Sequence, residues 1–145
     1  MFVVDTNILV YARDSGAREH DKCKRLLEDW RRSPAAWYTT WSILYEFLRV
    51  VTHPRVFRRP LSLEEAWHFL DSIFASRGLR ILANGSNHAT VAATTFGEIQ
   101  GIRGNLLHDA HTAILMREHG IRRIYTRDTD FHRFPFLEVI DPLSM

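Results

Sequence analysis

Near its start the chain reads FVVDTNILVYA, residues 2–12, and this segment indicates the fold class. Its first three residues are apolar and predict a short buried strand. Asp5, Thr6 and Asn7 follow, and all three are residue types that commonly begin a helix, where their side chains accept backbone hydrogen bonds. The apolar residues after them predict a short helix. A buried strand that passes directly into a helix is typical of an α/β protein.

The rest of the chain repeats this alternation of strand and helix. The pattern predicts further strands over 36–39, 80–82, 123–126 and 136–140, and helices over 19–32, 40–51, 63–74, 87–100 and 106–119. Three local signals support the boundaries: Thr40 as a helix N-cap, a capping box that begins at Ser62, and Gly120 after the last helix. The alternation predicts an α/β fold with a largely parallel sheet.

The composition is that of a folded globular protein. Its 145 residues contain 46% hydrophobic and 25% charged residues, which excludes a disordered chain. With no repeat or linker, residues 1–145 are expected to form a single domain. Cys23 is the only cysteine, so no intrachain disulfide is expected and a reducing compartment fits. Neither a signal peptide nor an apolar run of about 20 residues is found, so we expect a cytoplasmic protein without a membrane span.

The basic residues are mostly arginines. Lys and Arg together number 19 against 17 acidic residues, and only Lys22 and Lys24 are lysines. Arginine binds phosphate groups bidentately, although a GC-rich genome also favours it. The arginines gather in two clusters, over 55–59 and 122–133, which either contact phosphates or are simply solvated. Without the four acidic residues discussed next, 13 acidic residues remain against 19 basic ones. The rest of the protein then has a net charge of +6, which would attract nucleic acid.

Four acidic residues lie in unusual places. Asp5 ends the first predicted strand and Asp128 follows the fourth, whereas Glu46 and Asp109 lie within largely apolar helices. Each has an ordinary explanation when taken alone. Asp5 can cap a helix, Glu46 can pair with Arg49, Asp109 can favour a helix N-terminus, and Asp128 can form a turn.

Taken together, the four acids favour a metal site. The carboxyl ends of parallel strands meet at one edge of the sheet, where sites of α/β proteins form. Carboxylates about 5 Å apart repel by about 3 kcal/mol per pair at an effective dielectric of about 20. Such a cluster requires protons or cations, and oxygen ligands suit Mg²⁺ or Mn²⁺ better than zinc. Hydrolysis of phosphoryl esters is the chemistry that matches this arrangement.

Four segments, in order, resemble the motifs of PIN-domain nucleases. They are residues 3–11, Glu46, residues 104–113 (GNLLHDAHTA) and residues 125–131 (YTRDTDF). Size and motif style most resemble the VapC ribonuclease toxins of bacterial toxin–antitoxin pairs. The resemblance implies a three-layer α/β/α fold with a central, largely parallel sheet, and Mg²⁺- or Mn²⁺-dependent cleavage of RNA. It also implies a homodimer, a cognate VapB-like antitoxin, and structured targets such as tRNA or rRNA.

The resemblance assigns the site residues. Asp5, Glu46, Asp109 and Asp128 would form the catalytic and metal-binding set, with Asp130 as an additional ligand. The Asp-Thr-Asp spacing leaves open whether Asp128 or Asp130 faces the metal. We favour Asp128, because it lies nearer the end of its strand.

Two threonines beside these acids are further candidates. Thr6 and Thr126 would donate hydrogen bonds to the carboxylates or to the attacking water, although a local capping function explains either of them equally well.

Three alternatives to a toxin remain at this point. One is a PIN-fold nuclease that processes RNA without an antitoxin, and another is a non-catalytic module that binds RNA or a partner protein. The third follows from His108 and Asp109, which resemble the doublet of HD-type metal phosphohydrolases. That family is entirely helical and needs further histidines in order, so the doublet carries little weight.

Overall fold

The computed structural model describes all 145 residues and is centred on a five-stranded sheet. Its strands are β1 (Phe2–Val4), β2 (Trp37–Thr40), β3 (Leu79–Leu82), β4 (Arg123–Tyr125) and β5 (Glu138–Ile140). They lie in the order β3-β2-β1-β4-β5, and all neighbouring strands pair in parallel. The prediction of a largely parallel sheet is therefore confirmed.

Helices connect these strands at the predicted places. They are α1 (Thr6–Arg13), α2 (His20–Arg32), α3 (Trp41–Thr52), α4 (Leu63–Phe74), α5 (His88–Glu98) and α6 (Leu106–Glu118). Two 3₁₀ helices that the sequence did not predict, η1 (Thr129–Arg133) and η2 (Pro142–Ser144), follow β4 and β5. The last strand begins later than expected, because Leu137 N donates to Phe134 O across 3.0 Å and the chain turns there.

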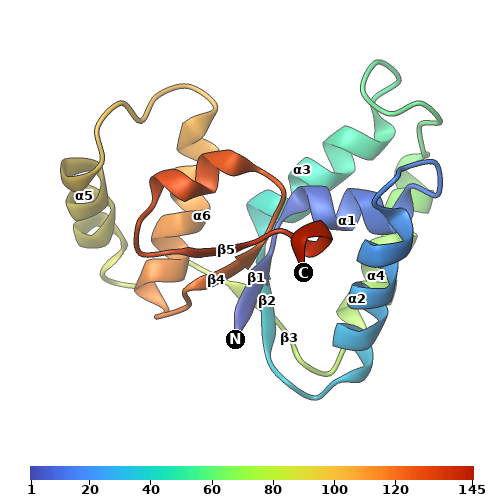
Figure 1. The fold of residues 1–145 in the computed structure, drawn as a ribbon, viewed down its shortest axis with the longest axis horizontal. Coiled ribbons are helices and arrows are strands. Elements are labelled where there is room, and N and C mark those ends of the chain that lie inside the picture. The colour runs from blue at the N-terminus through green and yellow to red at the C-terminus, as the bar shows by residue number, and fades with distance from the viewer.

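The helices cover both faces of the sheet. The chain moves from β1 through β2 to β3, and then crosses back to β4 on the other side of β1. Crossovers between parallel strands are right-handed. Because the chain reverses its direction across the sheet after β3, the helices between β3 and β4, α5 and α6, lie on the face opposite to the earlier helices. Figure 1 shows this arrangement, with α1, α2 and α4 on one side and α5 and α6 on the other. The expected three-layer α/β/α architecture is thus present.

Local sequence signals act where they were expected. The Thr40 hydroxyl accepts a hydrogen bond from Ile43 N and begins α3. Ser62 and Glu65 form the complete capping box of α4. Gly120 follows α6 with a φ of 67°, a left-handed conformation that glycine adopts without strain. These signals hold the ends of the helices that carry or support the acidic residues.

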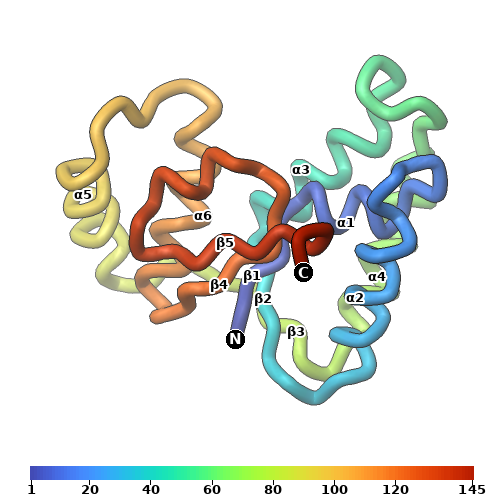
Figure 2. The backbone as a smooth tube through the Cα atoms, viewed as in Figure 1, coloured from blue at the N-terminus to red at the C-terminus, as the bar shows by residue number.

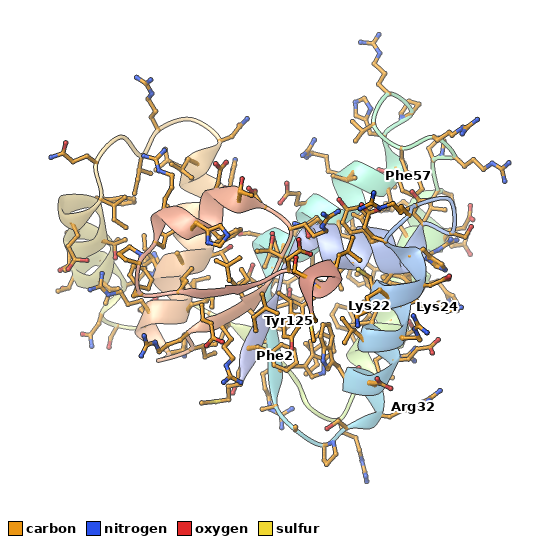
Figure 3. The ribbon with its side chains drawn as sticks, viewed as in Figure 1. Phe2, Lys22, Lys24, Arg32, Phe57 and Tyr125 are labelled. Carbon is orange, nitrogen blue, oxygen red and sulfur yellow. The ribbon has the colours of Figure 1, made fainter.

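A continuous core holds the central strand β1 and its neighbour β4. It comprises 27 buried hydrophobic residues, and Val3 and Val4 of β1 are fully buried within it. At its edge the rings of Phe2 and Tyr125 meet edge to face with 4.9 Å between centroids (Figure 3). Trp30 of α2 contacts both rings, at 4.9 and 4.8 Å. β1 and β4 are therefore packed rigidly beneath the residues that follow them.

No helix has the length and apolar character that crossing a membrane requires.

Candidate metal centre

The point where the strand order reverses lies between β1 and β4. These strands are neighbours, yet the chain moves from β1 to β2 in one direction and from β4 to β5 in the other. In parallel sheets this reversal leaves a crevice at the carboxyl ends of the two strands, and ligands bind there. Asp5 directly follows β1, and Asp128 lies shortly beyond β4. The fold therefore brings together two acids that are far apart in the sequence.

Asp5 is a buried carboxylate that does not act as a helix cap. It occupies the N-cap position of α1, but its side chain makes no capping hydrogen bond. Its Oδ2 instead accepts hydrogen bonds from Thr126 Oγ1 at 2.7 Å and Asn7 Nδ2 at 3.0 Å. Burial raises the pKa of Asp5 to about 6, although the Thr126 hydrogen bond opposes that shift. The site interpretation of Asp5 is thus favoured over the capping interpretation.

Asn7 and Thr126 tie the ends of β1 and β4 together. Asn7 Nδ2 also donates to Thr126 Oγ1 at 2.9 Å, and Asn7 Oδ1 accepts from Arg127 N at 3.0 Å. Thr126 Oγ1 in turn accepts from Asp128 N at 2.9 Å. The predicted contact of Thr126 with a carboxylate is confirmed. Asn7 was expected only as a helix-starting residue, and its contacts with Thr126 and Arg127 depend on the β1–β4 pairing, which no local pattern reveals.

Glu46 reaches the same place from the middle of α3. Its Oε2 accepts a hydrogen bond from Thr6 Oγ1 at 3.1 Å, as predicted for this threonine. Its Oε1 also lies 3.7 Å from Arg49 Nη2, so the ordinary explanation of an ion pair holds as well. The Glu46 side chain is 47% exposed, which leaves it open to a ligand on one side.

Asp109, in the first turn of α6, faces the other acids. The pKa of its half-buried carboxyl is raised to about 7, first by burial and then by Asp128, Asp5, Asp130 and Glu46. No hydrogen bond opposes these contributions. The dependence of one pKa on the other four acids is the electrostatic signature of a carboxylate cluster.

Asp128 and Asp130 both lie beside Asp109. Carboxylate oxygens of the three residues lie within 4.8 Å of one another, close enough to share a cation. Asp128 also accepts a hydrogen bond from Asp130 N at 2.9 Å, so it forms the turn that its sequence position suggested. Asp128 is partly buried whereas Asp130 is exposed. This difference supports our preference for Asp128 as the principal ligand of the pair.

Two pockets open onto these acids and share Asp5, Glu46 and Asp109 as lining residues. One, of about 260 Å³, is completed on its acidic side by Asp128. The other, of about 330 Å³, extends along α3 past Tyr45 and Arg49. Tyr45 was not expected at the site, and only its position next to Glu46 could have suggested it.

The donor set fits a small divalent cation. The clustered ligands are carboxylates, and Thr126, Asn7 and Thr6 hold two of them by hydrogen bonds. Oxygen-only sets suit Mg²⁺ and Mn²⁺ rather than zinc or copper. Because a divalent cation would offset the mutual repulsion that raises the pKa of Asp109, the cluster is suited to binding one.

Comparison with known proteins agrees with this geometry. The family model described as "PIN domain" matches residues 2–137. Ribonuclease VapC48 of Mycobacterium tuberculosis is 34% identical over 140 residues, which cover 97% of this chain and 96% of that protein. VapC ribonuclease Mb2897 of Mycobacterium bovis is 33% identical over 144 residues, or 99% of this chain and 97% of its own.

Solved structures share the fold. VapC20 of M. tuberculosis, described as a sarcin–ricin loop cleaving toxin, superposes with a TM-score of 0.67 at 23% identity, covering 97% of this chain and all of that one. VapBC2 from Rickettsia felis, solved with a promoter DNA fragment, gives 0.68 at 22% identity and covers 96% of both chains. The solved structures show the same fold, and the family model and the relatives show that the chain belongs to the PIN-domain family and, within it, to the VapC group.

Proposed function

We propose that this protein is a divalent-metal-dependent endoribonuclease that hydrolyses phosphodiester bonds in RNA. One observation carries the proposal: acids from separate elements of the chain converge where the strand order reverses, and the pKa of Asp109 responds to all of them. The full-length similarity to proteins named VapC ribonucleases supports the same activity.

The metal ligands we propose are Asp5, Glu46, Asp109 and Asp128, with Asp130 as an additional ligand. Mg²⁺ or Mn²⁺ is the cofactor that this set suits. When bound, one or two such ions orient and activate water and stabilise charge on the phosphate and the leaving oxygen. The same acids would serve as the catalytic set.

The surrounding residues position these ligands. Thr126 and Asn7 each donate to Asp5 Oδ2, which leaves its Oδ1 free of them. Thr6 fixes Oε2 of Glu46 in the same way. Hydrogen bonds of this kind orient a carboxylate and keep it ionised, and they change metal affinity or activity by about 10–100-fold.

We further propose that the protein is the toxin of a toxin–antitoxin pair. Its named relatives are VapC proteins, and its structural neighbours include VapBC2 of R. felis and FitAB, bound to DNA fragments. This proposal includes a cognate VapB-like antitoxin, a homodimer and a structured RNA target such as tRNA or rRNA. It also includes a single domain over 1–145 and a cytoplasmic location. Expression in a bacterial host should arrest growth, and the product of a neighbouring gene should relieve the arrest.

Cleavage of total small RNA by the purified protein tests the enzymatic proposal. We expect cleavage with Mn²⁺ or Mg²⁺, and none with EDTA or in the Asp5→Asn variant. Asp71→Asn is the matched control, because Asp71 is an exposed acid on α4 outside both pockets. Full activity of Asp5→Asn, or equal activity with EDTA, would overturn the proposal.

A further inference from the structure

One arginine of the second basic cluster is paired with carboxylates instead of being solvated. Arg127 lies two residues beyond β4, and its side chain is 29% exposed. Its Nη1 donates to Glu19 Oε1 at 2.7 Å, and its Nε donates to Asp141 Oδ1 at 3.2 Å. Every other ion-paired arginine of the protein has a single carboxylate partner. Arg127 is thus held in place rather than free to bind a phosphate.

The two carboxylates come from distant parts of the chain. Glu19, the N-cap residue of α2, has a side chain 16% exposed, and Asp141, directly after β5, has one 31% exposed. Asp141 Oδ1 also accepts from Leu143 N at 2.9 Å and begins η2, which contacts α2. Figure 2 shows this C-terminal segment, in red, beside the blue helices that follow the N-terminus. We call Glu19, Arg127 and Asp141 the arginine clamp, because they join three segments of the chain.

The backbone of Arg127 faces the metal centre. Its N donates to Asn7 Oδ1 at 3.0 Å, and Asn7 Nδ2 donates in turn to Asp5 Oδ2 at 3.0 Å. The next residue is Asp128, whose Cα the peptide bond keeps about 3.8 Å away. Arg127 therefore contacts the acidic cluster with its backbone and the clamp with its side chain, so a shift of Arg127 displaces both acids.

Few other interactions hold this part of the chain. Thr126 N donates to Ile140 O at 3.1 Å, the last backbone hydrogen bond that joins the end of β4 to β5. Beyond it, the amides of Arg127 and Asp128 donate only to side chains. Repulsion between Asp128 and Asp109 acts against this support when no cation is bound. The clamp is the anchor on the side away from the acids.

We propose that Arg127 is a positioning residue of the nuclease site. Its double ion pair with Glu19 and Asp141 fixes the chain beyond β4. Arg127 thereby holds Asp128 and, through Asn7, Asp5 at the spacing that a shared cation requires. This inference rests on the proposed function. Arginine is required here, because its planar fork presents donors to two carboxylates at once, whereas lysine has one point charge on a flexible stem.

The competing explanation is an ion pair that only stabilises the fold. The protein has such a pair on the same strand: Arg123 and Glu138 lie 3.2 Å apart, and both side chains are 59% exposed. Neither residue lines the two pockets at the acidic cluster. Arg127 differs because it is less exposed and is followed directly by a proposed ligand. Arg123→Lys is therefore the matched control for Arg127→Lys.

Amide exchange in the cation-free protein, followed by NMR, tests the positioning directly. Arg127→Lys should speed exchange at the amides of Arg127 and Asp128 by at least about tenfold relative to those of β1. A purely stabilising pair would speed exchange equally throughout the sheet. Glu19→Ala and Asp141→Ala, which each leave Arg127 one partner, should have the same local effect, and they replace Arg127→Lys if it does not fold. Asp141→Asn keeps an acceptor oxygen and should restore much of the protection.

Mn²⁺ binding and kinetics connect the clamp to the site. Arg127→Lys should weaken Mn²⁺ binding by about tenfold in calorimetry. At saturating Mn²⁺ it should lower kcat for RNA about tenfold and leave KM within about twofold. Because Glu19 acts through Arg127, Glu19→Ala should have little further effect in the Arg127→Lys background. Arg123→Lys should change none of these quantities.

The outcomes separate this inference from the proposed function. If the unsubstituted protein binds Mn²⁺ and cleaves RNA, and the clamp variants match it in Mn²⁺ affinity, kcat and local exchange, the positioning function is refuted and the nuclease stands. Additive effects of Glu19→Ala and Arg127→Lys would also refute it, because the two residues would then act separately. If the unsubstituted protein neither binds Mn²⁺ nor cleaves RNA, the proposed function fails and the inference with it.

Discussion

The two halves of the acidic cluster are supported in different ways. The half at the strand ends carries Asp5 and Asp128, which are linked through Thr126 and Asn7 by hydrogen bonds of 2.7–3.0 Å. The half on the helices carries Glu46, held by one hydroxyl, and Asp109, which no hydrogen bond stabilises. We call these the strand half and the helix half.

This difference indicates how the site is assembled. The strand half is fixed by the fold itself, because β1 and β4 pair in register and their following residues bond to each other. The helix half brings Asp109 against the other carboxylates without a compensating hydrogen bond, so a bound proton or cation would stabilise the folded protein there. Under the proposed function, the strand half would therefore position the proposed ligands, and the helix half would supply much of the affinity for a cation.

The largest expected effect is on the helix half. Asp109→Asn removes a proposed metal ligand and should lower RNA cleavage by about a thousandfold or more. The same change removes a repelled charge, so it should stabilise the cation-free protein against urea at about pH 8. Initial cleavage rates and urea unfolding in EDTA measure the two effects. A variant that is inactive because it is unfolded would contradict this explanation, and Asp71→Asn should change neither quantity.

The pH dependence of stability is the next largest effect. The folded-state pKa values of Asp5 and Asp109, about 6 and about 7, exceed their ordinary value of 3.8. Between the ordinary pKa of 3.8 and these raised values, the folded protein therefore binds more protons than the unfolded chain. Its free energy of unfolding falls as the pH rises through this range. The shift at Asp5 alone corresponds to about 3 kcal/mol.

Urea unfolding in EDTA at about pH 5 and about pH 8 measures this loss of stability. In the Asp5→Asn variant the difference between the two pH values should shrink, because asparagine does not titrate. An equal difference in the variant would show that Asp5 titrates normally in the folded protein.

A smaller effect is expected when one hydroxyl of the strand half is removed. Thr126→Val removes one of the two side-chain hydrogen bonds to the buried Asp5 carboxylate and leaves Asp128 N without its partner, at a cost of about 1–3 kcal/mol. Thr6→Val removes a single hydroxyl beside the partly exposed Glu46 and should cost about 1 kcal/mol or less. Chemical unfolding of both variants compares the halves directly. Equal costs would remove the distinction between them.

The smallest effect concerns the ion pair on α3. Arg49 and Glu46 are separated by 3.7 Å with side chains 64% and 47% exposed, so solvent screens their attraction. Arg49→Gln should change the free energy of unfolding by less than about 1 kcal/mol. Thermal unfolding measures this, and a larger loss would mean that Glu46 depends on Arg49 for its position.

Much of this architecture could be predicted from the sequence, because its signals are local. The alternation of apolar strands with capped helices depends on neighbouring residues such as Thr40 and the Ser62–Glu65 capping box. Asp5 and Asp128 could be predicted as neighbours because parallel strands share a carboxyl edge. The start of β5 could not, because the turn that delays it depends on a backbone hydrogen bond between Leu137 and Phe134.

The support of the site was harder to predict because it is not local. Thr126 and Asn7 contact each other only through the pairing of β1 with β4, more than a hundred residues apart. Tyr45 reaches the pocket because α3 turns that face towards the crevice, which its own sequence does not indicate. The acidic residue types alone predicted a metal site, whereas the strand order was needed to find the residues that orient the carboxylates.

Calorimetric titration of Mn²⁺ into the cation-free protein at about pH 6 and about pH 8 tests whether the acidic cluster binds a divalent cation in exchange for protons. At the lower pH, Asp5 and Asp109 are partly protonated, so binding should release protons, and buffers of different ionisation enthalpy measure that release. Asp109→Asn should bind at least about tenfold more weakly and release fewer protons, whereas Asp71→Asn should match the unsubstituted protein. Equal Mn²⁺ affinity in Asp109→Asn, or binding without proton release at the lower pH, would show that the cation does not bind at Asp109.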